Sequence, residues 1–151
     1  MELASYISGF TDGEGTFSVS FSQCSRLKTQ IEARPSFSIS QHKRSKEILL
    51  KIKKFFGVGR IRFSKSDENF KYEVRSINDL INIIIPHFEK YPLYTQKKKD
   101  FEIFVDICKM MSKGLHLDSD FLIKIIEKAY LMNESGKRKY SKQKLLSLVI
   151  R

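Results

Sequence analysis

The 151-residue chain has no tryptophan, only three prolines, seven glycines and two cysteines, and fewer acids than bases. Cys24 and Cys108 form neither a CxxC pair nor a disulfide framework, which favours a reducing compartment. The longest apolar runs, such as Ile83-Ile84-Ile85, fall far short of the roughly 18 residues that a membrane span needs. The N-terminal residues, Glu2 among them, contain no cleavable apolar segment, so we expect no membrane association and no secretory signal.

Basic residues are in excess: 28 Lys and Arg against 17 Asp and Glu give a formal charge of +11. This charge indicates a polyanionic partner, and nucleic acid leads because neutralised phosphates release counterions. An anionic membrane surface is the weaker alternative, since the basic residues are spread along the chain. A charge that serves only solubility, or association with the ribosome, is the third. Twelve Phe, six Tyr and 41% hydrophobic residues supply a core, so we expect one domain over residues 1–151.

Hydrophobic periodicity predicts both helices and strands. We expect helices over 2–11, 45–56, 76–85, 96–111, 119–132 and 142–149, and strands over 16–22, 34–40, 60–64 and 70–75. Asp12-Gly13-Glu14-Gly15 should stop the first helix in a tight turn, because two glycines in four residues disfavour continuation. Pro86 should kink or end its helix, because it lacks an N–H.

The order αββαββα, with extra C-terminal helices, predicts an α+β fold. Four strands that pair as hairpins give an antiparallel sheet, and such a sheet can leave one face open to water. All four strands place Phe, Ile, Val or Tyr on one face, which needs helices over it. The opposite, polar face carries Ser18, Ser20, Ser22, Arg34, Ser36, Ser38, Ser40, Arg60, Arg62, Lys71, Glu73 and Arg75.

This polar face is almost free of acids, whereas an ordinary solvated face mixes Glu, Lys and Thr. Arg can bind guanine through two hydrogen bonds, and Ser can donate or accept at base edges. We therefore favour a DNA groove as the partner of this face, with a merely solvated face as the alternative. The basic stretch Lys137-Arg138-Lys139 is expected to bind phosphates.

Residues 7–15, with the sequence ISGFTDGEG, resemble the signature of the LAGLIDADG homing endonucleases, a helix of small residues that ends in an acid-Gly-acid-Gly turn. The match holds at Gly9, Asp12, Gly13 and Gly15, with Ser8 in the alanine position, Glu14 for the commoner aspartate and Thr11 for an aliphatic residue. The blocks 91–101 and 114–117 and the order of elements extend the resemblance over nearly the whole chain.

The resemblance implies an enzyme that cuts both strands of a long, near-palindromic DNA target. The chain holds one acid-Gly-acid-Gly motif, and two cuts need two symmetry-related sites, so we expect a homodimer. Ser8 and Gly9 leave little side chain between two copies of the first helix, and Ser5 and Asp12 are expected at the same interface. The alternative is that these small residues pack on the sheet of their own chain.

By the same resemblance, Glu14 would hold a catalytic metal with its carboxylate and Gly13 with its carbonyl. Mg²⁺ tolerates so few protein ligands when water and phosphates complete its shell, and Mn²⁺ or Ca²⁺ could occupy the same site. Gln41 matches a position that orders water at the scissile phosphate, and Lys97 matches a lysine that approaches it. The register of that lysine could differ by one residue, and a solvated helix start is the alternative for Lys97–Lys99. Without the motif, Glu14 would be interpreted as a solvated acid.

The expected function is therefore metal-dependent, site-specific hydrolysis of duplex DNA, with no small-molecule substrate. An intron-RNA maturase and a non-cleaving DNA-binding regulator on the same fold are the alternatives. The family is often encoded in introns, which implies a chloroplast, a mitochondrion or a microbial cytoplasm. His42, His87 and His116 have no ligand spacing with the cysteines, and we expect no metal there.

Overall fold

The computed structural model describes residues 2–133 and 138–150 of the chain. One antiparallel sheet has the strand order β1-β2-β4-β3, so two hairpins are joined through β2 and β4. The strands are β1 (Gly15–Gln23), β2 (Ile31–His42), β3 (Arg60–Ser64) and β4 (Asn69–Val74). This arrangement confirms the predicted four-stranded sheet, with strands up to five residues longer than expected.

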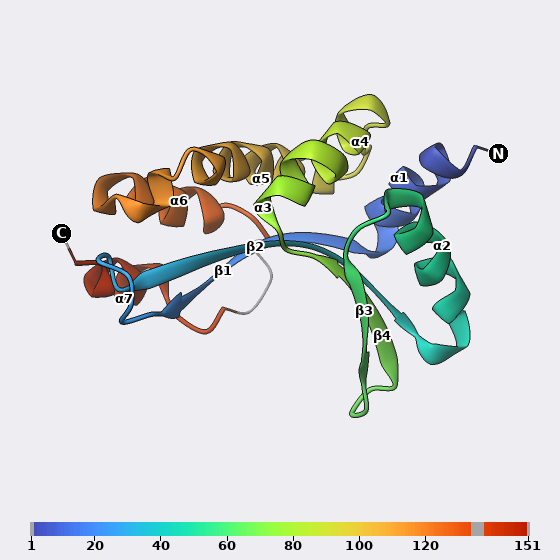
Figure 1. The fold of residues 1–151 in the computed structure, drawn as a ribbon, viewed down its shortest axis with the longest axis horizontal. Helices are drawn as coiled ribbons and strands as arrows, with labels where there is room; N and C mark the ends of the chain where they lie inside the picture. Colours follow the sequence, from blue (N-terminus) through green and yellow to red (C-terminus); the bar gives the residue numbers. More distant parts are fainter. Residues whose placement is uncertain (1, 134–137, 151) are drawn as a thin grey trace.

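Helices α3 to α6 lie over one face of this sheet, α1 and α2 stand at one end, and α7 lies at the other (Figure 1). The β3–β4 hairpin descends from the opposite face, which α3 to α6 leave uncovered. None of the described helices is long and apolar enough to cross a bilayer. The helical elements are α1 (Leu3–Glu14), η1 (Lys43–Ser45), α2 (Lys46–Phe56), α3 (Ile77–Asp79), η2 (Leu80–Ile84), α4 (Ile85–Lys90), α5 (Lys97–Ser112), η3 (Leu115–Leu117), α6 (Ser119–Ala129) and α7 (Lys142–Leu148).

The core lies between the helices and the apolar face of the sheet. Phe17 is completely buried there, and its ring centroid lies 5.1 Å from Phe37 and Phe101 and 5.3 Å from Phe104. Burying a side chain of this size contributes about 1.5–3 kcal/mol of transfer free energy. The α+β class and the αββαββα order are thus confirmed.

Strand register sets the rows of the polar face. Thr16, Ser38, Glu73 and Arg60 form one row across the four strands. In the next row towards the end of α1, Lys71 pairs with Ser40 of β2 and with Arg62 of β3. Because side chains alternate between faces with a period of two, every second residue of each strand joins these rows.

The predicted tight turn at the end of the first helix is wrong. Helix α1 continues through Asp12 and Gly13 to Glu14, and β1 starts at the next residue, Gly15. Gly15 is extended, with φ −86° and ψ 165°, and its amide donates to the Thr11 carbonyl. Contacts with the start of α5 hold this last turn, so tertiary structure overrides the low helix propensity of glycine.

The expectation that Pro86 could end its helix is also wrong. The preceding residues widen into the π turn η2, in which the Ile85 amide donates to the Leu80 carbonyl. Pro86 then occupies the first turn of α4, where a missing N–H costs little, and helical structure continues to Lys90.

Candidate active site and nucleic-acid interface

Glu14 is the last residue of α1, at the end of the polar face. Its side chain is exposed, and among the described residues no hydrogen bond or ion pair occupies its carboxylate. Gly15 pairs with Ile39 of β2, which places Gln41, two residues further along β2, beside the last turn of α1. The side-chain Nε2 of Gln41 donates to the Ser40 carbonyl at 2.9 Å. The structure therefore brings Glu14 and Gln41 to one corner of the sheet.

Asp12 joins the last turn of α1 to the segment before α5. Its Oδ2 accepts the Tyr94 amide at 2.9 Å, and its Oδ1 accepts the Thr95 amide at 3.1 Å and the Thr95 hydroxyl at 2.7 Å. Partial burial acts to raise the pKa of Asp12, but these hydrogen bonds and the Lys97 ammonium outweigh it, so the pKa lies below its ordinary value. The carboxylate of Asp12, predicted at the interface with a second copy, is thus engaged within its own chain.

Lys97 contacts the same helix end from α5. Its Nζ donates to the Thr11 carbonyl at 2.9 Å and to the Asp12 carbonyl at 3.2 Å. Partial burial lowers the pKa of Lys97, and the carboxylates of Asp12, Asp100 and Glu14 only partly offset this effect. The lysine is half-buried beside Glu14 and is not the solvated helix start that was the alternative.

The two following lysines point elsewhere. Lys98 borders a groove between α4 and α5, together with Phe101 and Glu102. Lys99 lines a separate groove along the edge of β1. Of the three lysines, Lys97 is the one that hydrogen-bonds to α1, which favours the register that the sequence suggested.

The end of α1 offers the few protein oxygen ligands that are expected for Mg²⁺. The last four carbonyls of a helix have no intrahelical partner. Lys97 occupies that of Asp12 and also binds the Thr11 carbonyl, which accepts the Gly15 amide, whereas no side-chain donor of the described residues reaches the Gly13 carbonyl. Within 2–133 and 138–150, no three His, Cys, Asp or Glu residues form a group that could hold a metal ion by themselves. Glu14 and Gly13 would therefore share the ion with water and phosphate oxygens, as Mg²⁺ allows.

The outer face of α1 carries a row of small residues, Ser5, Gly9 and Gly13, each four positions apart and all exposed. A Cβ atom added at Gly9 or Gly13 would have no neighbour within 4 Å in this chain. Packing within the chain therefore does not explain either glycine, and the alternative that both pack on their own sheet does not hold for them.

Ser8, predicted at the interface with a second copy, faces its own chain instead. Its side chain is 4% exposed, its hydroxyl donates to the Tyr91 carbonyl at 2.6 Å, and it lies 3.2 Å from His87 Nε2. Burial lowers the pKa of His87 to about 4, so this imidazole is neutral at physiological pH. The expectation for Ser8 is wrong because the hydroxyl finds these partners in the layer between α1 and α4.

Three predicted DNA-binding residues lie on the polar face but are covered. Ser36 is 9% exposed, and Ser38 and Glu73 are each 7% exposed. Glu73 is bound by Arg62 at 3.0 Å and by Lys71 at 3.5 Å. Direct contact of these three residues with DNA is therefore a wrong expectation, since their side chains are buried in the chain itself.

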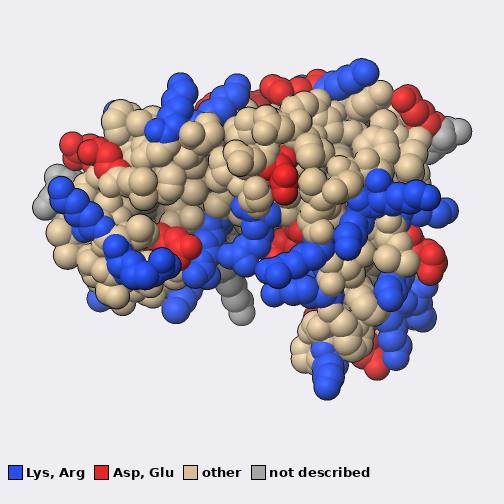
Figure 2. Space-filling view, viewed as in Figure 1, with Lys and Arg blue, Asp and Glu red and all other residues tan. Residues whose placement is uncertain are grey.

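The exposed part of the polar face is strongly basic. Lys and Arg predominate on the lower half of the molecule, around the β3–β4 hairpin, whereas the helical layer carries both signs (Figure 2). The sequence interpretation missed Glu32, because β2 begins at Ile31 and not at Arg34; Glu32 forms an ion pair with Arg34 at 3.2 Å. The exposed predicted residues are Ser20, Arg34, Ser40, Arg60, Arg62 and Arg75, while Ser18, Ser22 and Lys71 are half-buried.

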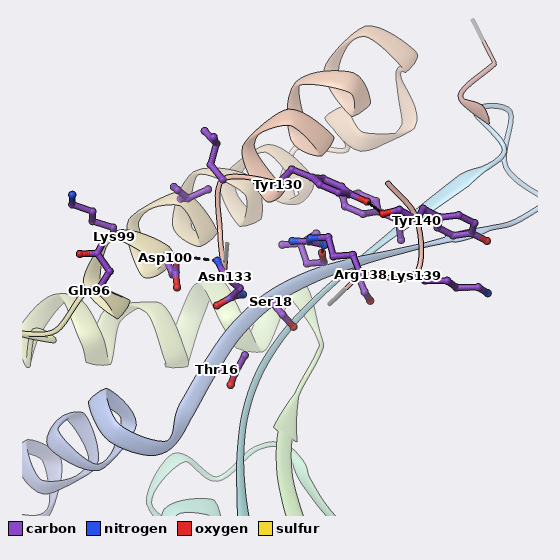
Figure 3. Close-up of a pocket in the computed structure, with 15 residues that line it drawn as sticks. Thr16, Ser18, Gln96, Lys99, Asp100, Tyr130, Asn133, Arg138, Lys139 and Tyr140 are labelled. Carbon is purple, nitrogen blue, oxygen red and sulfur yellow. Dashed lines mark hydrogen bonds between the residues drawn. The ribbon is translucent and has the colours of Figure 1, made fainter. Parts of the chain in front are cut away.

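A groove of about 1030 Å³ runs along the outer edge of β1. Gln96 and Lys99 lie at one end of it, Lys139 and Tyr140 at the other, and Ser18 between them (Figure 3). The end with Gln96 adjoins Lys97, so the groove leads away from the corner that holds Glu14.

Arg138 lines this groove, is half-buried, and is bound within the chain through part of its guanidinium. Its two terminal nitrogens donate to the carbonyls of Val19 at 2.8 Å and Ala129 at 2.7 Å, and its guanidinium lies 4.4 Å from the Tyr130 ring centroid. These contacts use two of the five N–H donors of the guanidinium, so phosphate binding by Arg138 stays a prediction. Lys139 is exposed, and Lys137 lies outside the described residues.

Tyr94 and Thr95 are functional candidates that the sequence interpretation did not single out. They lie in the block 91–101, whose likeness to the family was noted, but no periodicity marks them. Their partner Asp12 lies more than 80 positions earlier. No local signal in the sequence could have identified this contact.

Fold and site together define a class: an αββαββα protein with an acid-Gly-acid helix end beside a basic sheet face. Residues 7–108 match the model of the family described as LAGLIDADG endonuclease. The chain belongs to the LAGLIDADG endonuclease family.

Three relatives illustrate the similarity. "Probable intron-encoded DNA endonuclease 1" of Mycosarcoma maydis is 33% identical over 93% of this chain and 50% of its own length. The homing endonuclease I-TnaI has a crystal structure with a TM-score of 0.88 and 38% identity, over 96% of this chain and 97% of that chain. I-SmaMI, bound to uncleaved DNA target in the presence of calcium ions, has a TM-score of 0.85 and 32% identity, over 90% of this chain and 46% of its own. This chain spans half or less of the length of the first curated relatives that it matches.

Proposed function

We propose that the chain is a subunit of a site-specific DNA endonuclease that hydrolyses one phosphodiester in each strand of a duplex. The observation that carries this proposal is the corner at which Glu14, Gln41 and Lys97 meet the end of a basic sheet face. The relatives named above as endonucleases, and the one bound to DNA target, support the same activity.

The active form is a homodimer in which two copies of α1 face each other. The I-SmaMI chain is about twice as long as the part that this chain matches, so one copy of this chain corresponds to half of that protein. Ser5, Gly9 and Gly13 form the face along which two helices can approach closely. A two-fold axis there would bring two Glu14 residues near each other, one for each strand.

The duplex binds across the exposed polar face. Arg60, Arg62 and Arg75 contact base edges and phosphates in the major groove, and Ser20 and Ser40 add hydrogen bonds. From the corner that holds Glu14, the sugar-phosphate backbone of the DNA follows the groove along β1, where Lys99 and Lys139 bind phosphates. This arrangement predicts the salt dependence that counterion release produces.

Each chain residue at the corner has a separate task. Glu14 and the Gly13 carbonyl hold a divalent cation, expected to be Mg²⁺, which supplies charge stabilisation to the attacking and leaving oxygens of the phosphodiester. Lys97 places a positive charge beside the phosphate, and Gln41 orients water by hydrogen bonding. The calcium ions in the I-SmaMI structure support the use of a divalent cation by a relative.

The test is cleavage of a randomised duplex library in Mg²⁺ by the wild-type protein and by Glu14→Gln. The variant keeps the shape of the side chain and removes its charge, so we expect cleavage to fall by about 10³-fold or more, with unchanged salt-sensitive binding. Glu127→Gln, an exposed acid of α6, is the matched control and should cut normally. Equal cutting by wild-type and Glu14→Gln proteins would exclude Glu14 from the mechanism. Binding without cutting by the wild-type protein would favour the regulator, and preference for folded intron RNA would favour the maturase.

A further inference from the structure

We propose that Asp12 and Thr95 are positioning residues that fix the Lys97 ammonium relative to Glu14. The inference rests on the proposed function, since it assigns how one residue of that site is held in place. It concerns two side chains that act through Lys97 and do not themselves touch the DNA.

The Asp12 carboxylate is matched to three donors. Tyr94 N–H meets one oxygen, and Thr95 N–H and Thr95 O–H meet the other, at 2.7–3.1 Å. A carboxylate accepts on both oxygens, whereas an amide side chain presents a donor on one side. Asp12→Asn would therefore set an N–H group against one of these donors while it leaves the volume of the side chain unchanged.

The Thr95 hydroxyl connects Asp12 to the first turn of α5. It donates its single proton to Asp12, and it accepts the Lys97 amide at 3.3 Å. The Thr95 carbonyl accepts the Lys98 amide at 3.0 Å. These bonds satisfy orphan amides at the start of α5 and tie the backbone of Lys97 to α1 through one residue.

The Lys97 side chain completes a closed series of hydrogen bonds, which we call the ring of Asp12, Thr95 and Lys97. Its Nζ donates to the carbonyls of Thr11 and Asp12. Asp12 therefore holds Lys97 directly by its carbonyl at the ammonium, and indirectly by its carboxylate, which binds the Thr95 hydroxyl that accepts the Lys97 amide. A lysine has four flexible side-chain bonds, and two fixed contacts restrict it to one region of the corner. An ammonium has three N–H donors, so one is left for a phosphate oxygen.

The arrangement also determines which helix carbonyls remain available. Lys97 uses the carbonyls of Thr11 and Asp12, and the next in order is that of Gly13. A change in the start of α5 would move the ammonium along this row of carbonyls. The ring of Asp12, Thr95 and Lys97 therefore controls the position of the charge with respect to both Gly13 and Glu14.

The experiment compares Thr95→Val, Thr95→Ser, Asp12→Asn and Lys97→Met by single-turnover cleavage of the library-selected target, with DNA binding measured on the same proteins. We expect Thr95→Val to slow cleavage by about 10- to 100-fold at unchanged affinity, because a displacement near 1 Å has this effect on a reacting geometry. Thr95→Ser keeps both hydrogen bonds and should restore the wild-type rate. Adding Thr95→Val to Lys97→Met should cause no further loss, since the two residues act as one unit.

Amide hydrogen exchange gives a readout that is independent of cleavage. In the wild-type protein the amides of Tyr94 and Thr95 should be protected, and Asp12→Asn should release them while the core strands stay protected. Thr95→Val that cuts at the wild-type rate, while Lys97→Met is inactive, would overturn the positioning role alone. Lys97→Met that cuts at the wild-type rate would overturn the proposed role of Lys97 in catalysis, and the inference with it.

Discussion

Two cations of this chain, Lys97 and Arg138, both donate to backbone carbonyls, yet their surroundings differ. Lys97 binds the end of α1 among the carboxylates of Asp12, Asp100 and Glu14, and one of its donors remains free. Arg138 binds the carbonyls of Val19 and Ala129 beside the Tyr130 ring, at the outer edge of β1. The sequence predicted contact with nucleic acid for both.

The neighbours of a basic residue decide its role more than its charge does. A cation whose neighbours are an aromatic ring and carbonyls of its own chain stabilises the fold. A cation beside an exposed carboxylate such as that of Glu14, at the end of an open sheet face, can act on a ligand. Arg60, Arg62 and His87 extend the comparison. No ion pair is found for Arg60 among the described residues, Arg62 forms an ion pair with Glu73, and His87 is buried.

The largest effect in this comparison is expected for Lys97→Met. Loss of the ammonium should reduce cleavage by about 100-fold, because it removes a charge that stabilises the transition state. Thermal unfolding should change little, since the contact is half exposed. Lys113→Met, an exposed lysine beyond α5, is the control. A large loss of stability, with normal cleavage by the protein that remains folded, would show that Lys97 stabilises the fold, as Arg138 is expected to do.

Arg138→Met should show the opposite pattern. Two half-buried carbonyls would lose their partner, so we expect the free energy of unfolding to fall by about 2 kcal/mol. Cleavage by the folded protein should be unchanged. Denaturant unfolding measures the first quantity, and the neighbouring variant Lys139→Met should leave it unaltered. If Arg138→Met instead weakens DNA binding at full stability, the guanidinium binds phosphate as the sequence first suggested.

On the sheet face, Arg60 and Arg62 provide a matched pair. Arg62 is bound to Glu73 at 3.0 Å, whereas no ion pair is found for Arg60 among the described residues. Arg60→Ala should weaken binding by about tenfold, the effect of one lost DNA contact. Arg62→Ala should have a smaller effect, because the ion pair with Glu73 already offsets part of the positive charge of Arg62. Binding titrations at two salt concentrations test this order, and the reverse order would show that Glu73 orients Arg62 towards the DNA.

The smallest effect concerns His87, whose partners all lie within the chain. Its pKa is about 4 in the folded protein against an ordinary value of 6.5, so the unfolded chain binds the proton more readily. Stability should therefore fall as the pH drops below 6.5 and level off below 4, with a loss of about 0.8 kcal/mol between pH 8 and pH 6. His87→Gln should remove this part of the pH dependence. An unchanged difference between pH 8 and pH 6 in the variant would assign the effect to other groups.

The sequence predicted the sheet and the helices well because their signals are local. Alternation at Phe17, Val19 and Phe21 marks β1, and Asp118 caps α6 through the amides of Asp120 and Phe121, two and three residues further along the chain. The contacts that define the site are not local.

Nothing near Asp12 indicates that its partners are Tyr94 and Thr95, and the Arg138 carbonyl partner Val19 lies 119 positions away. The sequence did not predict that α1 continues through Gly13, because the contacts that stabilise this turn come from α5, far along the chain. The motif located Glu14, but geometry alone shows which lysine meets it.

In the proposed dimer, each chain supplies one Glu14 and cuts one strand. The most direct test is a heterodimer of one wild-type and one Glu14→Gln subunit, purified by two different affinity tags and mixed with a supercoiled plasmid that carries the selected target. We expect nicked circles as the product of this heterodimer and linear plasmid as the product of the wild-type homodimer. Linear plasmid from the heterodimer at the wild-type rate would contradict one cut per chain.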